Sequence, residues 1–539
     1  MNKKFKSYVI LPVLLQTIAW PIIRLLFTVF ARFKVEGLEH LNNMTGPGIF
    51  VSNHPNQADP IFVRCALPWL SSHAPLFWLS RDKKTYNWSG WRKYIFTDAF
   101  FLSWGAPVAP AGLKNYAESL KTHVRLMYDG YDFNMFPQAG DEKFHGKDAP
   151  IHGGVAYLAH ATGAPIVPIA IIGSEKFHFL DLFAGKCQIT VIFGVPIPAD
   201  SLGLFTDEDV TIDEYKTVAR SIMDRIYMIK SAHEGHGEVT VPSIETPAVV
   251  HDTALRLEKD GSHRNPYNFF VVPLLNALPP RLRNTAKKTN RAAREVIEHK
   301  TTHRALEVLY QEPDAPRPKT SAIEELFYKI WFSTSNSKAV RNRLKIVKRE
   351  LKHACTELFS RGEDVRLISI ASGSARAVIE ALNELTVPAG KSVKVLFVDK
   401  SPHALEYSKR LAGETGLTQR YPLSWAEDTA SKFMQHHQDG SPNIVEMVGL
   451  LDYFDDTKMH DLFENIHTNL APGGYFITGN IAHNRERKFV TKFIGWKMVY
   501  RFAQEVARAM ENVGFDPHNI RPYYEPMRVQ SVVVAQKQL

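Results

Sequence analysis

The chain has 539 residues, which is too long for one hydrophobic core and predicts several compact units. Hydrophobic residues make up 45% and charged residues 22%, and this balance excludes both a largely disordered chain and a transporter with many membrane spans. The net charge of +9 favours an anionic partner, and the candidates are a phospholipid surface, a phosphate-bearing cofactor and a nucleic acid.

Residues 1–34 are predicted to contact a membrane. These residues include six Lys or Arg, no acidic residue and the apolar run YVILPVLLQTIAWPIIRLLFTVF (8–30). Pro12, Gln16, Pro21 and Arg24 interrupt this run, and an arginine at mid-bilayer costs about 3 kcal/mol, so an interfacial or re-entrant anchor is favoured over a span. The segment lacks a small-residue cleavage site, which argues against a signal peptide. A buried core helix is the remaining alternative.

Residues 35–233 are predicted to form an α/β domain. Four β-rich runs bounded by Gly and Pro are expected to be strands, at 46–53, 132–138, 164–173 and 188–198. Residues 115–130 and 152–163 have helical spacing and end in glycine. Strands that alternate with helices in this way predict a layered α/β fold.

The stretch VSNHPNQADP (51–60) sets a histidine and an aspartate five positions apart. Asp59 precedes Pro60 and an apolar run, so it is predicted to be the N-cap of a helix with proline at N1. In a tight loop after a strand, the Asp59 carboxylate can reach one ring nitrogen of His54 and leave the other nitrogen to act as a general base. A histidine with a purely structural role is the alternative for these two residues taken alone.

The motifs around this pair carry a resemblance to a known family. VEGLEHL (35–41), FPQAG (136–140), GGVAYLAHATGAPIVPIAIIG (153–173) and ITVIFGVPIP (189–198) follow in order. Over residues 35–199 the chain resembles the glycerolipid acyltransferase family of the 1-acylglycerol-3-phosphate type. The resemblance implies transfer of a fatty acyl group from acyl-CoA or acyl carrier protein, with His54 as general base and Asp59 as its orienting partner. It also implies an acceptor-binding block, Phe136, Pro137 and Gln138, and a structural block, Val167 and Pro168.

Three positions depart from the family pattern. The family's glutamate is Gln138 here, its next glycine is Ala139, and Pro110 stands where members that accept a phosphate-bearing acceptor carry arginine. Without that arginine a bidentate grip on phosphate is lost, so glycerol 3-phosphate is disfavoured as the acceptor. A hydroxyl or an amine of a lipid-like acceptor is expected instead. The intact histidine and aspartate favour an active enzyme over an inert relative.

Residues 234–319 are predicted to be a partly helical linker, because both ends are rich in Pro, Ser, Thr and charge. The basic run RLRNTAKKTNRAAR (281–294) has no interleaved aromatic residues that would stack on bases. A solvated helix face or a contact with lipid headgroups is therefore favoured over nucleic-acid binding. Helical runs at 322–332 and 342–362 then introduce a second domain.

Residues 320–539 are predicted to form this second α/β domain, with a largely parallel sheet. The expected strands lie at 365–372, 393–400, 443–449, 473–480 and 528–537. After the first strand a turn of small residues leads into a helix, so backbone N–H groups can approach a bound carboxylate or phosphate. The second strand ends in Asp399, which is placed to accept hydrogen bonds from ribose hydroxyls. A dinucleotide dehydrogenase would share this geometry.

Later segments distinguish a dinucleotide dehydrogenase from other proteins that bind a nucleoside cofactor. SWAEDTASKF (424–433), NIVEMVGLLDYFDD (443–456) and NLAPGGYFITGNI (469–481) follow in the order of class I S-adenosylmethionine-dependent methyltransferases, which residues 323–539 resemble. The resemblance implies a Rossmann-like fold and S-adenosylmethionine as cofactor, bound by Ser369, Ala371, Gly373, Ala375, Asp399, Glu427 and Asp428. Two glycines of the family signature are alanine here, and its opening acid is serine. A domain that binds the cofactor without catalysing methyl transfer therefore stays an alternative.

Three residues are candidates for the methyl-acceptor side of this domain: Asp452, Tyr453 and His483. They are expected in loops at the carboxyl edge of the sheet, and for each an ordinary loop or capping role is the alternative. GLLDYF (449–454) stands where aminomethyltransferases that act on DNA bear an Asn/Asp-Pro-Pro-aromatic block. Base methylation is therefore disfavoured.

The whole sequence predicts an N-terminal acyltransferase α/β domain fused to a C-terminal Rossmann-like methyltransferase. Such an enzyme would acylate a lipid-like acceptor and methylate the same or a related product at the cytoplasmic face of the inner (plasma) membrane. Three widely spaced cysteines, Cys65, Cys187 and Cys355, favour a reducing environment and provide no metal ligand set. The alternatives are an acyltransferase with a non-catalytic cofactor-binding domain and, less favoured, a membrane-tethered nucleic-acid methyltransferase.

Overall fold

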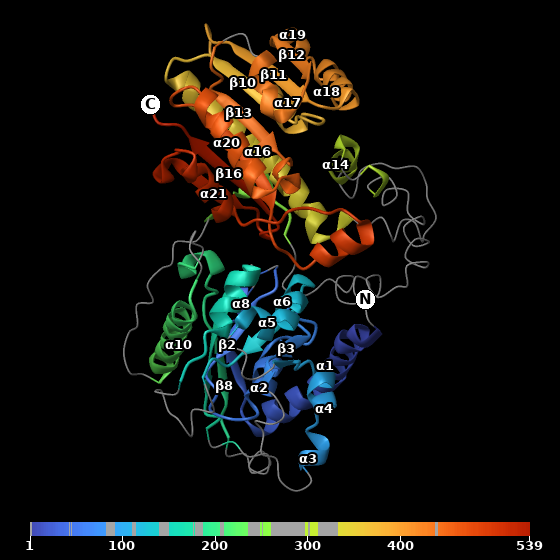
Figure 1. Cartoon of the computed structure of the whole chain (residues 1–539), viewed down its shortest axis with the longest axis vertical. Coiled ribbons are helices and arrows are strands. Elements are labelled where there is room, and N and C mark those ends of the chain that lie inside the picture. The colour runs from blue at the N-terminus through green and yellow to red at the C-terminus, as the bar shows by residue number, and fades with distance from the viewer. Residues whose placement is uncertain are drawn as a thin grey trace. The chain divides into compact units, whose positions relative to one another are not determined.

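A computed structural model describes residues 3–41, 44, 46–81, 92–109, 115–138, 150–175, 177, 187–204, 210–234, 248–250, 252–259, 297–299, 302–310, 332–436 and 440–539. Contacts divide the chain into two compact units. Unit 1 comprises Met1–Thr246, Asp260–Pro273 and His483–Lys488, and unit 2 comprises Pro247–Lys259, Leu274–Ala482 and Phe489–Leu539. Each unit is a mixed α/β structure with a mostly parallel sheet (Figure 1).

The sheet of unit 1 has six strands in the order β1-β8-β7-β2-β6-β3. All neighbours are parallel except β7 and β8. The four predicted strands are confirmed, and two three-residue strands, β1 and β3, had no pattern long enough to detect. The bounds are β1 (Lys34–Glu36), β2 (Ile49–Ser52), β3 (Leu76–Trp78), β6 (Asp132–Met135), β7 (Ile166–Ile172) and β8 (Thr190–Phe193), with a separate pair formed by β4 (Ser80–Arg81) and β5 (Val108–Ala109).

Helices cover both faces of this sheet. Phe27 of α1 and Phe62 of α2 belong to one apolar core, whereas Leu126 of α6, Val155 of α8 and Ile222 of α10 belong to a second core. The predicted helical run at 115–130 is confirmed but is divided at Leu120 into α5 and α6. The bounds are α1 (Lys3–Phe30), α2 (Asp59–Ala66), α3 (Arg92–Ile95), α4 (Asp98–Trp104), α5 (Tyr116–Ser119), α6 (Lys121–Tyr128), α8 (Gly154–Thr162) and α10 (Ile212–His233).

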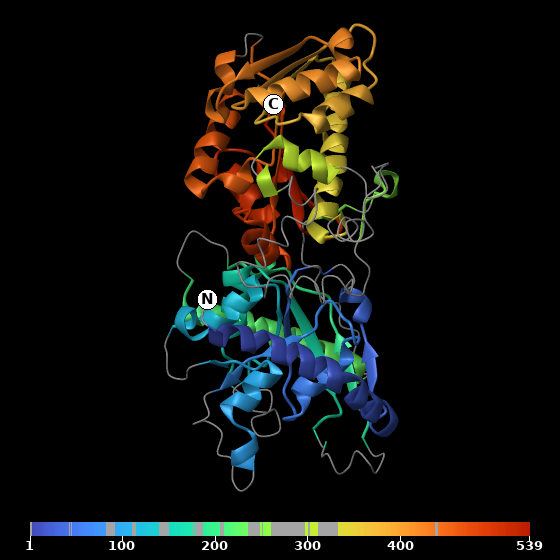
Figure 2. The same cartoon turned by 90° about the vertical axis from the view of Figure 1, so that its right-hand side faces the viewer.

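Helix α1 lies along the surface of unit 1, and Figure 2 shows it in dark blue across the face turned to the viewer. The polar residues that interrupt its apolar run point into the unit: Gln16 is 3% exposed and donates to the carbonyl oxygens of Leu76 and Trp104. Arg24 donates to the Cys65 carbonyl oxygen at 2.9 Å. By length and composition alone, residues Val9–Phe30 of α1 could cross a membrane. Seven large apolar side chains are exposed among the residues of α1 whose side chains are described: Ile10, Leu11, Leu14, Ile18, Ile22, Leu25 and Val29.

The sheet of unit 2 has eight strands in the order β12-β11-β10-β13-β14-β16-β15-β9. The strands from β12 to β14 are parallel, and β16 is antiparallel to both of its neighbours. The strand order reverses between β10 and β13, so the carboxyl ends of these two strands flank a topological switch point. The bounds are β9 (Ala248–Val249), β10 (Val365–Ile370), β11 (Val393–Asp399), β12 (Leu423–Glu427), β13 (Ile444–Val448), β14 (Tyr475–Ile481), β15 (Ile520–Tyr524) and β16 (Gln530–Gln536).

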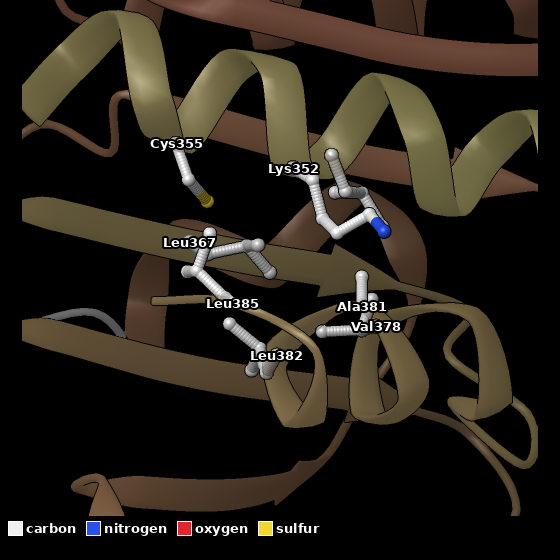
Figure 3. A pocket seen from close by; sticks show the side chains of 8 residues that line it. Lys352, Cys355, Leu367, Val378, Ala381, Leu382 and Leu385 are labelled. Carbon is white, nitrogen blue, oxygen red and sulfur yellow. The ribbon is translucent and has the colours of Figure 1, made fainter. Parts of the chain in front are cut away.

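Two apolar cores enclose this sheet. One core holds buried side chains of α16, α17 and α18, and the other holds those of α20 and α21. Between α16 and α17 lies a small apolar crevice at which Cys355, Leu367 and Leu382 converge (Figure 3). The bounds are α14 (His303–Tyr310), α16 (Ser335–Ser360), α17 (Arg376–Asn383), α18 (Pro402–Glu414), α19 (Leu417–Arg420), α20 (Asp456–Asn469) and α21 (Ala503–Asn512).

Several sequence predictions concern residues that the structure does not describe. Pro110 and Ala139, two of the departures from the acyltransferase pattern, lie outside the described residues, as does the basic run 281–294. Of the segment predicted to be a linker, 234–319, helix α14 is described, and it packs on α16 in unit 2.

Candidate active sites

The loop that carries His54 begins where β2 ends. Asn53 fixes this point, because its side chain donates to the carbonyl oxygen of Ile171 on β7 at 2.9 Å and accepts from the N–H of the same residue at 2.8 Å. Since β2 and β7 are parallel neighbours, the two strands end side by side. His54 therefore stands just beyond the carboxyl edge of the sheet, where α/β folds place ligand-binding residues.

The structure brings the predicted pair, His54 and Asp59, into contact. Nδ1 of His54 lies 2.9 Å from Oδ2 of Asp59. The same oxygen accepts the Asn56 N–H at 2.7 Å, and Oδ1 accepts the Ser174 hydroxyl at 2.9 Å. The Asp59 side chain is fully buried, whereas the His54 side chain is 23% exposed. The arrangement is a buried carboxylate that holds a partly open imidazole.

The electrostatics of the pair follow from this geometry. Burial raises the pKa of Asp59, and the hydrogen bonds from His54, Asn56 and Ser174 act in the opposite sense. Because an ionised carboxylate only accepts hydrogen bonds, Nδ1 of His54 is the donor and Nε2 carries the lone pair. Nε2 has no hydrogen-bond partner among the described residues. The ring can therefore accept a proton at Nε2.

The prediction that Asp59 is an N-cap is wrong in its detail. Helix α2 begins at Asp59, its N-cap position is Ala58, and no side chain caps it. The Asp59 carboxylate faces backwards to the Asn56 N–H and to His54 instead of forwards to the N–H groups of the first turn. Asp59 therefore does not cap helix α2, and its carboxylate is directed at His54 instead.

The predicted acceptor block divides into two environments. The Phe136 ring stacks on the His54 ring with centroids 4.2 Å apart. The Pro137 carbonyl oxygen accepts the His152 N–H at 2.9 Å. Gln138 is 2% exposed and its amide donates to the Tyr227 hydroxyl of α10 at 2.6 Å. Phe136 thus contacts the predicted base directly, whereas Gln138 is tied to a helix.

Ser174 is a residue of this site that the sequence pattern did not reveal. It is buried, directly follows β7 and Gly173, and lies 115 positions from the carboxylate that it contacts. Its only signal in the sequence is a polar residue immediately after an apolar strand. Such a residue becomes informative once that strand is known to neighbour the strand that carries the histidine.

The second site is the turn between β10 and α17. Ala371, Gly373 and Ala375 all have left-handed backbones, with φ of +51°, +55° and +54°. The Gly373 N–H donates to Oδ2 of Asp399 at 2.8 Å, and the Ser372 N–H donates to the Val398 carbonyl oxygen. The chain thus keeps a conformation that favours glycine although two of the three positions are alanine.

The predicted cofactor-side acids gather at one edge of the sheet. Asp399 ends β11 and is in register with Glu427, which ends β12. Oδ1 of Asp399 accepts the Ser401 N–H at 2.8 Å, so each of its oxygens holds one backbone donor and has a lone pair left. The N–H of the partly buried Asp428 donates to the Asp399 carbonyl oxygen at 3.2 Å. The structure brings these three acids together.

The sequence predictions did not include Glu446, a buried carboxylate beside the turn. Ser369 on β10 is in register with Glu446 on β13, and its hydroxyl donates to the Glu446 carboxylate at 2.6 Å. Both side chains are buried, and burial raises the pKa of Glu446 to about 7. A glutamate within the otherwise apolar strand NIVEMVG was the available signal. It lies at the switch point, next to the serine that replaces the family's acid.

The three candidates for the methyl-acceptor side have structural contacts. Asp452 is buried and accepts the Ile481 N–H at 2.9 Å, and burial raises its pKa to about 6. The Tyr453 hydroxyl accepts from Trp496 at 2.8 Å, and burial raises its pKa to about 12. His483 belongs to the segment His483–Lys488 of unit 1, and its Nδ1 lies 2.8 Å from the Arg487 guanidinium. Their role in methyl transfer stays a prediction.

The described residues contain no group of three or more His, Cys, Asp or Glu side chains that could hold a metal ion. One site offers a general base on a carboxylate, and the other offers a turn of backbone N–H groups beside three acids at a switch point.

Comparisons with solved structures find proteins of low sequence identity to this chain. They include a "possible exported protein" from Bordetella parapertussis, 18% identical, covering 50% of this chain and 87% of that one with a TM-score of 0.35. Magnesium protoporphyrin IX methyltransferase from Synechocystis PCC 6803 is 9% identical, with 43% and 91% covered and a TM-score of 0.30. The N-methyltransferase NodS from Bradyrhizobium japonicum is 15% identical, with 35% and 87% covered and a TM-score of 0.24.

Comparison with family models covers most of the chain. The family described as "Acyltransferase" matches residues 32–172, and the family described as "Putative methyltransferase" matches residues 303–537. A comparison with curated proteins gives no match. The chain therefore carries an acyltransferase domain at residues 32–172 and a methyltransferase domain at residues 303–537.

Proposed function

We propose that this chain is a bifunctional, membrane-associated enzyme that transfers a fatty acyl group and a methyl group to lipid-like acceptors. One observation carries the proposal: Nδ1 of His54 is held by a buried carboxylate while its ring stays partly open to solvent. The family match supports acyl transfer as the reaction class. The acyl donor, acyl-CoA or acyl carrier protein, and the lipid-like acceptor are proposed from the resemblance to glycerolipid acyltransferases.

In the proposed reaction, Nε2 of His54 takes the proton from a hydroxyl or amine of the acceptor as that group attacks the thioester carbonyl carbon. The C–S bond then breaks, an ester or amide forms, and the departing thiolate receives the proton from the imidazolium. Asp59 keeps Nδ1 protonated and stabilises the imidazolium between these two steps. Phe136 fixes the plane of the ring by stacking on it.

The acyl-transfer step is tested with purified protein, acyl-CoA or acyl carrier protein, and extracted cellular lipids. His54→Ala should lower the rate of acyl transfer by at least about 100-fold, because general-base catalysis contributes that much or more. His233→Ala is the matched control, since His233 lies on α10 and pairs with Glu36 at 3.4 Å. Wild-type rates in His54→Ala would contradict the proposed role.

The second half of the proposal is methyl transfer from S-adenosylmethionine, and the residues of the switch point fit this cofactor. The backbone N–H groups at the start of α17 suit its carboxylate, and Asp399 has lone pairs left for the ribose hydroxyls. Glu446 provides a buried carboxylate for the amino group, beside the serine that replaces the family's acid. S-adenosylmethionine, when bound, supplies an electrophilic methyl group on a sulfonium.

Methyl transfer is tested with methyl-labelled S-adenosylmethionine and the same lipid extract. Asp399→Ala should weaken binding of S-adenosylhomocysteine by at least about tenfold, because two hydrogen bonds to a carboxylate are lost, and it should abolish labelling of the product. Unchanged binding and labelling in this variant would contradict the assignment.

A non-catalytic cofactor-binding domain is the second candidate for residues 303–537. It is favoured by the structural contacts of Asp452 and Tyr453, whose side chains are bonded to Ile481 and Trp496. This candidate predicts that calorimetry detects cofactor binding while no label reaches any product. Label on a product would eliminate it.

Association with a membrane is proposed from helix α1. Seven of its described apolar side chains are between 42% and 65% exposed, and Gln16 and Arg24 hydrogen-bond to the protein. Such a helix is suited to lie in the plane of the interface, with its exposed apolar side chains in the lipid. We place the enzyme at the cytoplasmic face of the plasma membrane on this basis and because its three cysteines are free thiols, as a reducing environment favours.

We further propose that the two domains act on one product, because a covalent link raises the effective concentration of an intermediate. Lipid extracts of cells that express His54→Ala or Asp399→Ala should then lack the same final species. Loss of two unrelated species would show that the reactions are separate.

A further inference from the structure

We propose that His303 on helix α14 completes the nucleoside-binding part of the methyltransferase site and hydrogen-bonds a ribose hydroxyl of the cofactor next to Asp399. The inference deepens the proposed cofactor binding and rests on it. His303 precedes the strand-turn-helix by more than 60 positions and lies in the segment predicted to be a linker. No sequence pattern used above selects it.

Helix α14 lies against the turn that forms the cofactor site. A Cβ atom placed on Gly373 would be 3.6 Å from Cβ of His303, so the histidine backs directly onto the turn. The His303 ring is 5.2 Å from the Tyr407 ring of α18, and it is close enough to Asp399 for their charges to interact. Figures 1 and 2 show α14 in yellow-green beside α17 and α18.

An ion pair fixes this position. Glu307, one turn after His303, accepts from the Arg376 guanidinium at 3.0 Å and from the Tyr407 hydroxyl at 2.7 Å. Arg376 is the first residue of α17, which begins at the end of the turn. Since the same carboxylate bonds α17 and α18, α14 is held at a defined distance from the turn and from Asp399.

Two polar atoms at this place lack partners. His303 is only 8% exposed, and its Nδ1 has no hydrogen-bond partner among the described residues. The same is true of the Ser372 hydroxyl, which lies between Ala371 and Gly373 in the turn. A buried polar atom without a partner costs about 1–3 kcal/mol. A ligand that hydrogen-bonds to both of these atoms beside the Asp399 carboxylate would remove this cost.

The chemistry of that ligand follows from the groups that face it. Burial lowers the pKa of His303, so at pH 7 the ring is neutral and can accept one hydrogen bond and donate another. The Ser372 hydroxyl has the same dual capacity, and Asp399 accepts only. Vicinal hydroxyl groups, each a donor and an acceptor, satisfy all three, and the ribose of a nucleoside presents them.

The experiment compares the wild type with His303→Phe, which keeps a ring against Tyr407 and removes both ring nitrogens. Calorimetry with S-adenosylhomocysteine should show affinity about tenfold lower for His303→Phe, with an unchanged unfolding temperature. Analogues of S-adenosylhomocysteine that lack the 2′- or the 3′-hydroxyl identify the contact. For one of them, the loss of affinity caused by the missing hydroxyl should be smaller in His303→Phe than in the wild type.

His403→Phe is the matched control, because His403 is an exposed histidine on the neighbouring helix α18. Its affinity for S-adenosylhomocysteine should equal that of the wild type. Equal affinity of His303→Phe and wild type, or equal losses with both analogues in both proteins, would overturn the inference and leave cofactor binding intact. A wild-type protein that does not bind S-adenosylhomocysteine would overturn both the inference and the proposed methyl transfer.

Discussion

At the scale of single residues, Asp59 depends on neighbours from two parts of the chain. Asn56 belongs to its own loop, whereas Ser174 comes from the end of β7. Because the carboxylate is fully buried, each hydrogen bond helps to keep it ionised and aimed at His54. Ser174 therefore acts through Asp59 and is a positioning residue.

Ser174→Ala should lower kcat/KM for acyl transfer by about tenfold, because it removes one hydrogen bond to a buried carboxylate. The pH profile should also move, since a less stabilised carboxylate supports the imidazolium less well. Ser174→Thr, which keeps the hydroxyl, should recover most of the rate. A Ser174→Ala enzyme with wild-type kcat/KM and an unchanged pH profile would assign Ser174 to the fold alone.

Ala371 is strained by its backbone. An L-residue in the left-handed region costs about 1–2 kcal/mol, and Ala371 has a φ of +51°. Ala371→Gly should therefore stabilise the methyltransferase domain by about 1 kcal/mol, measured as a shift of its calorimetric unfolding transition. Ala377→Gly, inside α17, should instead destabilise it by about 1 kcal/mol. Equal destabilisation by both variants would show that the turn carries no such strain.

Residue-scale prediction from the sequence succeeded where the partners are close along the chain. His54 and Asp59 are only five positions apart, so a local pattern was sufficient to pair them. Ser174, Glu446 and His303 reach their sites from distant elements, and only the pairing of strands or the docking of a helix brings them there. Gln138 belongs to a local motif that predicted acceptor binding, but its side chain donates to Tyr227 on the distant helix α10. The motif alone could not reveal this contact.

At the scale of elements, β10 and β13 form the pair that defines the switch point. Their register places Ser369 opposite Glu446, and burial raises the pKa of Glu446 from 4.5 to about 7. Between these values the folded protein retains a proton that the unfolded chain has lost. The free energy of unfolding therefore falls as pH rises through this window.

Glu446→Gln removes this titration and keeps an acceptor for Ser369. The stability of the variant relative to wild type should rise from about pH 4.5 to pH 7 and then level off, at a difference of up to about 3 kcal/mol. Urea unfolding at a series of pH values measures it. Ser369→Ala should extend the window to higher pH, because its hydrogen bond lowers the pKa of Glu446. A pH-independent difference for Glu446→Gln would contradict the argument.

Helix α1 makes a further prediction at this scale. Ile18 and Ile22 are among its most exposed apolar residues, so the double variant Ile18→Asp, Ile22→Asp should reduce sedimentation with vesicles that contain phosphatidylglycerol by at least about tenfold. Ile212→Asp, at an exposed apolar residue of α10, is the matched control and should sediment as the wild type does. Binding of the double variant at wild-type level would exclude α1 as the anchor, and resistance to an alkaline carbonate wash would indicate a span.

The long buried strands were predictable because short continuous apolar runs bounded by Gly and Pro are typical of strands inside a core. Strands β1 and β3 have three residues each, which is too short for any periodicity. Strand β12 is only partly buried, so its sequence, LSWAE, lacks a clear apolar pattern. Helix α14 has eight residues inside a charged segment, and its position depends on Glu307 and its partners in two other helices.

At the scale of the whole molecule, the alternation of strands and helices was sufficient to predict two α/β domains, and the resemblance of their motifs to two families predicted their reaction classes. Family matches at residues 32–172 and 303–537 agree with the two resemblances. The second match begins at residue 303, within the segment predicted to be a linker, because α14 belongs to the methyltransferase domain. The acceptor lies beyond the reach of sequence patterns, since it is selected by the shape of a site.

The most direct test of the account is a single reaction that contains both donors. Purified wild-type protein, His54→Ala and Asp399→Ala are each supplied with labelled acyl-CoA, methyl-labelled S-adenosylmethionine and extracted lipids, and products are resolved by mass spectrometry. We predict that the wild type adds both labels, that His54→Ala adds no acyl label, and that Asp399→Ala adds the acyl label without the methyl label. Acyl transfer by His54→Ala at the wild-type rate would contradict the central claim that this histidine is the base.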